Sequence, residues 1–112
     1  MNIHEMNLQP RFYDYIKNGT KRIELRLFDE KRQKIQLGDI IEFSASENES
    51  LKTEVIGILR YRTFAELFED FDISVLADDS MTKEELLEIL SEFYTPERQK
   101  EFGVVGIRIK VL

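Results

Sequence analysis

Alternation of apolar and polar residues predicts five β-strands along this chain. The clearest case is residues 20–27, where Ile23, Leu25 and Leu27 take odd positions and Arg22, Glu24 and Arg26 take even ones. Because side chains alternate across a strand, the aliphatic residues share one face and the charged residues share the other. The other β-prone segments are residues 3–8, 40–45, 51–63 and 103–112.

Apolar residues at helical spacing predict three helices. Pro10 favours a first helical turn, and the segment 10–17 ends at Asn18-Gly19, a typical helix stop. Residues 64–71 and 82–93 form the other two, and Thr82 with Glu85 matches a capping box at the start of the last helix. The order β-α-β-β-β-α-α-β favours an α+β fold, a small, mostly antiparallel curled sheet or β-barrel with flanking helices.

Length and composition predict one domain over residues 1–112. The chain has 112 residues, of which 42% are hydrophobic, and no repeat or low-complexity linker divides it. It has no cysteine and one histidine, His4, which excludes thiolate chemistry and leads us to expect no metal. It also lacks G-x-G-x-x-G and P-loop motifs, so we expect no cofactor.

Hydropathy along the chain predicts a cytoplasmic protein without membrane contact. No apolar run approaches the roughly 20 residues that a membrane span requires. The first residues, Met1-Asn2-Ile3-His4-Glu5, lack the charged and then apolar layout of a signal peptide.

Charge is divided unevenly along the chain, whose formal net charge is −6. Residues 1–62 hold 11 basic and 10 acidic residues, whereas residues 63–112 hold 5 basic and 12 acidic ones. Proteins that follow a long nucleic acid usually carry a basic surface. The acidic balance therefore favours a short ligand held by a few local donors. We expect the acidic helices of the second half to face solvent, away from any phosphate.

Glu24 and Arg26 form the strongest candidate binding pair in the sequence. They lie two residues apart on one strand face, with Cα atoms roughly 7 Å apart. The carboxylate accepts hydrogen bonds, and the guanidinium offers a planar fork of donors. Such a pair can read the edge of a base, or hold a phosphate while Glu24 orients a ribose hydroxyl. The same pattern also fits an exposed ion pair that contributes little to stability.

The segment Gly19-x-Lys21-x-x-Glu24-x-Arg26 resembles the G-x-K-x-x-E-x-R signature of the ASCH domain, a relative of the PUA RNA-binding fold. The flanking sequence and the order of strands resemble the family over essentially the whole chain. The resemblance implies a PUA-like curled β-barrel with a cleft beside the motif strand. In that cleft Lys21, Glu24 and Arg26 would bind RNA or a modified nucleoside or nucleotide. Lys21 shares the parity of the aliphatic residues, so it reaches the cleft only at the barrel mouth, where the pleat begins.

One branch of the ASCH-like proteins removes an acyl group from N4-acetylcytidine with a lysine, a threonine and a glutamate, which implies an alternative function. Lys21 matches the lysine, Glu24 stands at the threonine position, and Asp79 falls near the distant carboxylate. An amidohydrolase of this kind would use Glu24 to activate water and Lys21 as proton acceptor. A third alternative is a regulatory or interaction protein whose cleft takes a peptide or an acidic metabolite.

Several further side chains are candidates for ligand contacts. Lys31 and Arg32, with Lys34, follow the motif strand and form the best candidate phosphate-facing loop. Ser44 closes the next strand and either adds a hydroxyl to the cleft or acts as a capping residue. Arg60-Tyr61-Arg62 alternates cations with an aromatic ring, which suits backbone contacts and base stacking but equally an ordinary barrel strand.

Two other polar features have simpler interpretations. The doublet Asp78-Asp79 just before a predicted helix is more typical of solvated charge at a helix N-terminus than of a metal-binding pair. His4 is more typical of a surface or strand-edge residue than of a ligand.

Overall fold

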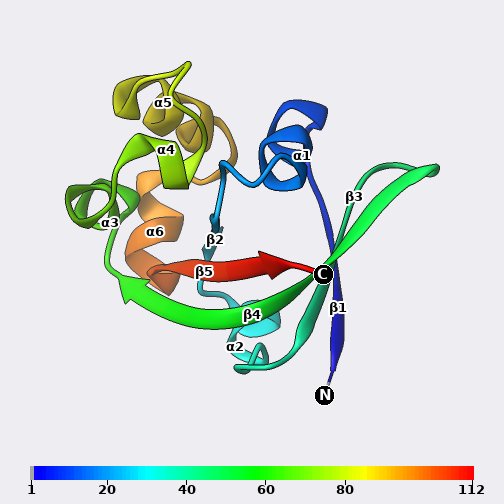
Figure 1. Cartoon of the computed structure of the whole chain (residues 1–112). Helices are drawn as coiled ribbons and strands as arrows, with labels where there is room; N and C mark the ends of the chain where they lie inside the picture. Colours follow the sequence, from blue (N-terminus) through cyan, green and yellow to red (C-terminus); the bar gives the residue numbers. More distant parts are fainter. Residues whose placement is uncertain (1) are drawn as a thin grey trace.

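A curled, mixed sheet of five strands forms the centre of the computed structural model, which describes residues 2–112 (Figure 1). The strands are β1 (Ile3–Asn7), β2 (Ile23–Leu27), β3 (Ile40–Ser46), β4 (Glu49–Tyr61) and β5 (Val104–Val111). Their order across the sheet is β1-β3-β4-β5-β2, in which β1 and β3 are parallel and all other neighbours are antiparallel. The predicted α+β fold with a mostly antiparallel curled sheet is confirmed, and the sheet is a half-barrel whose edge strands are β1 and β2.

Six helices flank the sheet within the described residues. They are α1 (Pro10–Lys17), α2 (Glu30–Gln33), α3 (Phe64–Asp70), α4 (Ile73–Leu76), α5 (Lys83–Phe93) and α6 (Pro96–Phe102). The three predicted helices correspond to α1, α3 and α5, whereas α2, α4 and α6 were missed. Helices α2 and α4 have four residues each, too few turns to establish a helical period, and α6 has Phe102 as its one large apolar residue and so shows no apolar stripe. No helix of residues 2–112 is both long and apolar enough to cross a membrane.

Strand β2 begins at Ile23, three residues later than the predicted strand. The backbone N–H of Lys21 donates to the carbonyl of Tyr15 in α1, and that of Arg22 donates to the carbonyl of Val75 in α4. The N–H groups of these two residues therefore donate to helices, and the ladder with β5 is entered only by the Arg22 carbonyl, which accepts from the Ile109 N–H at 3.1 Å. Lys21 lies before the pleat begins, which is the condition under which its side chain can reach the cleft.

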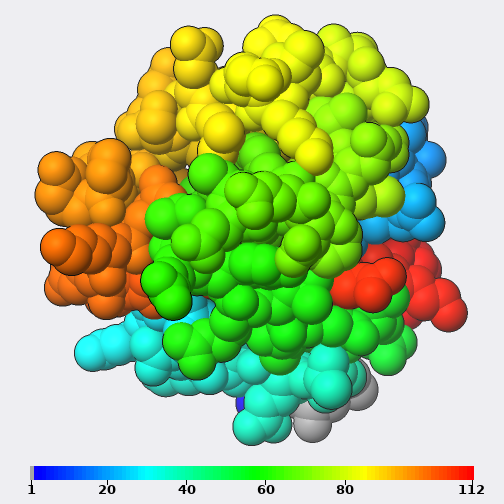
Figure 2. Space-filling view, turned by 90° about the vertical axis from the view of Figure 1, so that its left-hand side faces the viewer, coloured from blue at the N-terminus to red at the C-terminus, as the bar shows by residue number. Residues whose placement is uncertain are grey.

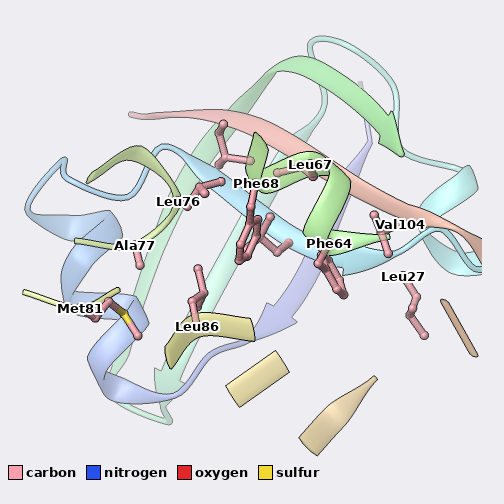
Figure 3. Packing of buried hydrophobic residues seen from close by; sticks show 11 residues of the cluster. Leu27, Phe64, Leu67, Phe68, Leu76, Ala77, Met81, Leu86 and Val104 are labelled. Carbon is pink, nitrogen blue, oxygen red and sulfur yellow. The ribbon is translucent and has the colours of Figure 1, made fainter. Parts of the chain in front are cut away.

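The two faces of β2 pack into two different hydrophobic cores. Ile23, Leu25 and Leu27 face a core built largely from helical residues, which include Phe64, Leu67, Phe68, Leu76 and Leu86. Figure 3 shows Leu86 of α5 pointing toward Phe68 of α3. The second core lies within the half-barrel and contains Tyr13, Ile16, Phe43 and Ile107, among others. Because Ile107 pairs with Glu24 across the sheet, the even-numbered face of β2 belongs to this inner side.

The capping box at the start of α5 is confirmed. The Thr82 hydroxyl accepts a hydrogen bond of 3.1 Å from the Glu85 N–H, and the Glu85 carboxylate accepts one of 3.0 Å from the Thr82 N–H. Beyond this cap, α5 packs on the helical core through Leu86, its fully buried residue, and through the partly buried Leu87, Ile89 and Leu90.

Leu86→Ala should lower the free energy of unfolding by about 2–5 kcal/mol, because it removes a fully buried side chain and leaves a cavity beneath α5. Glu88→Ala, on the exposed face of the same helix, should change it by no more than about 0.5 kcal/mol. Urea denaturation of the two variants provides the comparison, and equal effects would contradict the role given to Leu86.

Candidate functional site

A cleft of about 160 Å³ lies between β2, α1 and α5. Its polar floor is formed by Lys21, Glu24 and Arg26, the three charged residues of the sequence motif. Its walls are largely apolar and include Leu8, Phe12, Ile89, Leu90, Phe93 and Tyr94. The structure therefore brings the motif residues together at the base of a concave, mostly apolar site, the usual form of a small-molecule pocket.

Lys21 is held in place by main-chain acceptors. Its Nζ donates to the carbonyl oxygens of Ile23 and Leu76, each at 2.7 Å, and the side chain is only 3% exposed. The same nitrogen lies 3.6 Å from Oε1 of Glu24. An ammonium group has three N–H donors, so two are used by the backbone and the third is free to point toward the carboxylate.

Glu24 lies between the two cations. Its Oε2 accepts a 2.8 Å hydrogen bond from Nε of Arg26, while Oε1 faces Lys21. Arg26 also donates from Nη2 to the carbonyl oxygen of Asn7 at 2.8 Å and so connects edge strand β2 to edge strand β1. A guanidinium has five N–H groups, so three remain after these two bonds for the neighbouring Tyr94 and for a ligand.

Burial and charge act in opposite directions on the pKa values of this cluster. Burial lowers the pKa of Lys21, and the Glu24 carboxylate only partly offsets that effect. Burial alone would raise the pKa of Glu24, but the charges of Arg26 and Lys21 outweigh it and lower that pKa overall. The pKa of Arg26 is raised, because Glu24 and Tyr94 outweigh the effect of its burial. Glu24 is therefore ionised at neutral pH despite being buried.

The other predicted ligand residues do not line this cleft. Lys31 and Arg32 belong to α2, at the opposite end of β2 from α1, and Arg32 pairs with Asp29 at 3.2 Å. Five residues of β2, a length of roughly 16 Å, separate the two ends. Ser44 lines a depression along β1 and β3 that adjoins the cleft through Asn7 and Leu8 and also contains Glu5 and Glu42.

The acidic doublet and His4 also lie outside the cleft. Asp79 is exposed in the segment between α4 and α5, and Asp78 accepts a hydrogen bond from the N–H of Ser80. Residues 2–112 contain no group of three His, Cys, Asp or Glu side chains suited to a metal ion. His4 lies on edge strand β1, where its Nε2 is 2.9 Å from Oδ2 of Asp39. That contact and the Gln36 N–H lower the pKa of Asp39.

The apolar walls of the cleft were missed by the sequence analysis. Helix α5 belongs to the acidic segment that we expected to lie away from a ligand, yet Ile89, Leu90 and Phe93 of this helix line the cleft. Its glutamates are exposed to solvent, as expected. A helical apolar stripe indicates burial but does not distinguish a core from a cleft wall. Phe93 is 52% exposed, which periodicity could not reveal.

Comparison with known proteins gives one family match and several similar structures. The ASCH domain family model matches residues 6–112. The crystal structure of hypothetical protein PH0355 is 40% identical, with a TM-score of 0.88 and coverage of 98% of this chain and 99% of that one. The solution structure of PF0455 from Pyrococcus furiosus is 37% identical, with a TM-score of 0.79 and coverage of 98% and 97%.

A more distant structure, a mutant of ZmASCH from Zymomonas mobilis, is 12% identical, with a TM-score of 0.68, and it shares the fold over 97% of this chain and 68% of that one. No curated protein matches the chain significantly.

Glu24→Gln should lower the free energy of unfolding at pH 7 by about 3–5 kcal/mol, because it leaves two cations without their counter-charge. The pKa of Glu24 is lowered in the folded protein, so its ionised form stabilises the fold above the ordinary carboxyl pKa of about 4.3. That stabilisation is lost as the pH falls through the lowered value. Urea titrations at several pH values should therefore show the variant and the wild type converging in acid.

The exposed Glu5→Gln serves as the control for loss of a carboxylate and should have little effect at any of these pH values. A Glu24→Gln variant as stable as the wild type at pH 7 would show that the cluster is not an ion pair.

Proposed function

The chain belongs to the ASCH domain family, and from that membership we propose that its cleft binds one nucleoside-sized ligand. Binding would use Arg26 and Glu24 as the polar contacts and the aromatic and aliphatic walls as the stacking surface. The observation that carries this proposal is the buried Lys21–Glu24–Arg26 cluster at the base of an apolar cleft. A cluster of this kind contributes little net stability, because desolvation of three charges opposes their attraction.

The size of the cleft favours a single base over a longer ligand. Pockets for drug-sized molecules measure about 300–1,000 Å³, and this one measures about 160 Å³. A planar heterocycle is of a size for such a volume, and the cleft offers it both the Phe93 ring for stacking and the Arg26 guanidinium for hydrogen bonding.

The charge around the cleft favours a ligand with little negative charge. The exposed face of α5 carries Glu84, Glu85, Glu88 and Glu92 and has no basic residue beyond Lys83. These carboxylates would repel a phosphate chain that leaves the cleft on this side. We therefore propose a nucleoside, or one nucleotide of a short RNA, as the ligand, rather than a long RNA that runs along α5.

Each member of the cluster has a distinct part in binding. Arg26 offers its remaining N–H groups to the acceptor edge of the ligand, and the Glu24 carboxylate accepts from an amine or a ribose hydroxyl. Lys21 positions Glu24 and maintains its negative charge, because its own donors are largely used by the carbonyls of Ile23 and Leu76.

Amide hydrolysis is the second candidate function, and one observation favours it. Burial lowers the pKa of Lys21 while Glu24 beside it stays ionised, so an ammonium that gives up its proton more readily and a carboxylate base lie 3.6 Å apart. In such a reaction Glu24 would take a proton from water, whose oxygen attacks the acyl carbon. Lys21 would give a proton to the leaving amine nitrogen as the C–N bond breaks and would accept the proton held by Glu24 in return, so that a carboxylic acid and a free amine are released.

A titration of isotope-labelled protein with cytidine and with N4-acetylcytidine tests the binding proposal. Amide shifts should be confined to residues that line the cleft, among them Arg26, Leu90 and Tyr94. Arg26→Met should weaken binding about tenfold or more, because hydrogen bonds to a charged donor are lost. Phe93→Ala, which removes a half-exposed wall residue, should weaken it while leaving the fold intact. Arg32→Met, outside the cleft, is the matched control.

Acetate in the same samples tests the hydrolytic candidate. Release by the wild type and loss of release in Lys21→Met would establish hydrolysis, whereas binding without acetate would leave a binding protein. If neither compound shifts any cleft resonance at millimolar concentration, the nucleoside proposal is contradicted.

A further inference from the structure

A second concave surface lies between the end of β4 and α6, apart from the cleft. It measures about 830 Å³ and is lined by residues 60–63 with Glu66 on one side and by residues of α6 on the other. Figure 2 shows this side of the molecule, with α6 in orange beside the green segment of β4 and α3 and with the cyan segment of α2 below. We call this surface the β4–α6 groove.

Three cations line the β4–α6 groove and have no ion-pair partner within residues 2–112. Arg60, Arg62 and Lys100 are all exposed and form none of the salt bridges found in that part of the chain. Two carboxylates, Glu66 and Glu101, also line the groove, so its local charge is positive by one. The groove is therefore a local positive region on a protein whose net charge is −6, and a positive region attracts an anionic partner.

Arg60 gives this groove a feature beyond charge. Its guanidinium carbon lies 3.9 Å from the centroid of the Phe28 ring, so one face of the guanidinium stacks on the ring. The Arg60 side chain is exposed, which leaves the opposite face available. A guanidinium plane fixed in this way is a stacking platform for an unpaired base.

The groove and the cleft share no lining residue but are related through the sheet. Arg60 of β4 pairs with Val105 of β5, and Val105 pairs with Arg26 of β2. The two arginines therefore lie in one cross-strand row, with Cα atoms roughly 10 Å apart across two strand spacings. Substitutions can thus be made in one site without removing a residue from the other.

We propose that the β4–α6 groove binds a short stretch of single-stranded nucleic acid, with a base on Arg60 and phosphates at Arg62 and Lys100. This proposal does not depend on what the cleft holds. An acidic peptide could also use the cations, but a nucleic acid combines an aromatic base with a phosphate in every unit and so matches a stacking platform with cations beside it. The carboxylates of Glu66 and Glu101 restrict the contact to a few phosphates, so the salt dependence is modest.

Fluorescence anisotropy with a labelled oligoadenylate of about eight nucleotides, as RNA and as DNA, tests this proposal at low and at physiological salt. Arg60→Ala should weaken binding about fivefold or more, the loss expected from one base stack. Arg60→Lys should weaken it similarly, because it keeps the charge and removes the plane. The double variant Arg62→Ala/Lys100→Ala should reduce the slope of log K against log salt by up to about 1.4.

One control separates this groove from general charge. Lys52→Ala/Lys110→Ala removes two exposed lysines elsewhere on the sheet and should leave oligonucleotide affinity unchanged. Thermal melting checks that each variant is folded. If Arg60→Ala does not fold, Arg60→Lys alone tests the role of the guanidinium plane. The proposal is overturned if no oligonucleotide binds at low salt or if Arg60→Lys binds it with full affinity. It is also overturned if the Lys52→Ala/Lys110→Ala control loses as much affinity as the groove variants, or if polyglutamate competes for the groove as effectively as unlabelled oligonucleotide.

Discussion

The carboxylate of Glu24, buried between Lys21 and Arg26, is the interaction on which the arrangement of the site depends. Arg26 also donates a hydrogen bond to the Asn7 carbonyl on β1, and Lys21 also donates one to the Leu76 carbonyl in α4. One charged cluster therefore connects the two edge strands of the half-barrel with the helical layer. Burial of a carboxylate is costly unless its charge is compensated, and here two cations compensate it.

The half-barrel leaves an opening beside this cluster because its edge strands do not pair with each other. In the order β1-β3-β4-β5-β2, the outer strands β1 and β2 are both edges, and an Arg26 side chain bridges them where ladder hydrogen bonds would close a barrel. Helix α5 then covers the opening with an apolar face. Strand β2 thus supports a helical core with one face and presents the charged cluster with the other.

Local patterns in the sequence were sufficient to predict much of this architecture. Alternation along Ile23, Leu25 and Leu27 identified the motif strand, and the capping residues Thr82 and Glu85 identified the start of α5. The pairing of Glu24 with Arg26 follows from strand parity alone. Burial of this pair does not follow, because strand parity shows which side chains share a face but not whether other elements cover that face.

Positions that depend on long-range geometry could not be predicted in the same way. Lys31 and Arg32 follow the motif strand closely in sequence, but they lie in α2 beyond its C-terminal end and do not line the cleft. Conversely, Phe93 and Tyr94 are about 70 residues from Glu24 in sequence and line the same cleft. The apolar stripe of α5 was visible in the sequence, but only the packing of the helix against β2 reveals what it encloses.

The most direct test of this account is carbon-detected NMR of the Glu24 side-chain carboxyl, followed through an acid titration in the free protein and then at saturating cytidine. The account predicts a carboxyl that stays ionised below the ordinary range of glutamate and a resonance that shifts when cytidine is added. A Glu24 carboxyl that takes up its proton above the ordinary range, and whose resonance is unchanged by cytidine, would contradict both the ion-pair cluster and its part in binding.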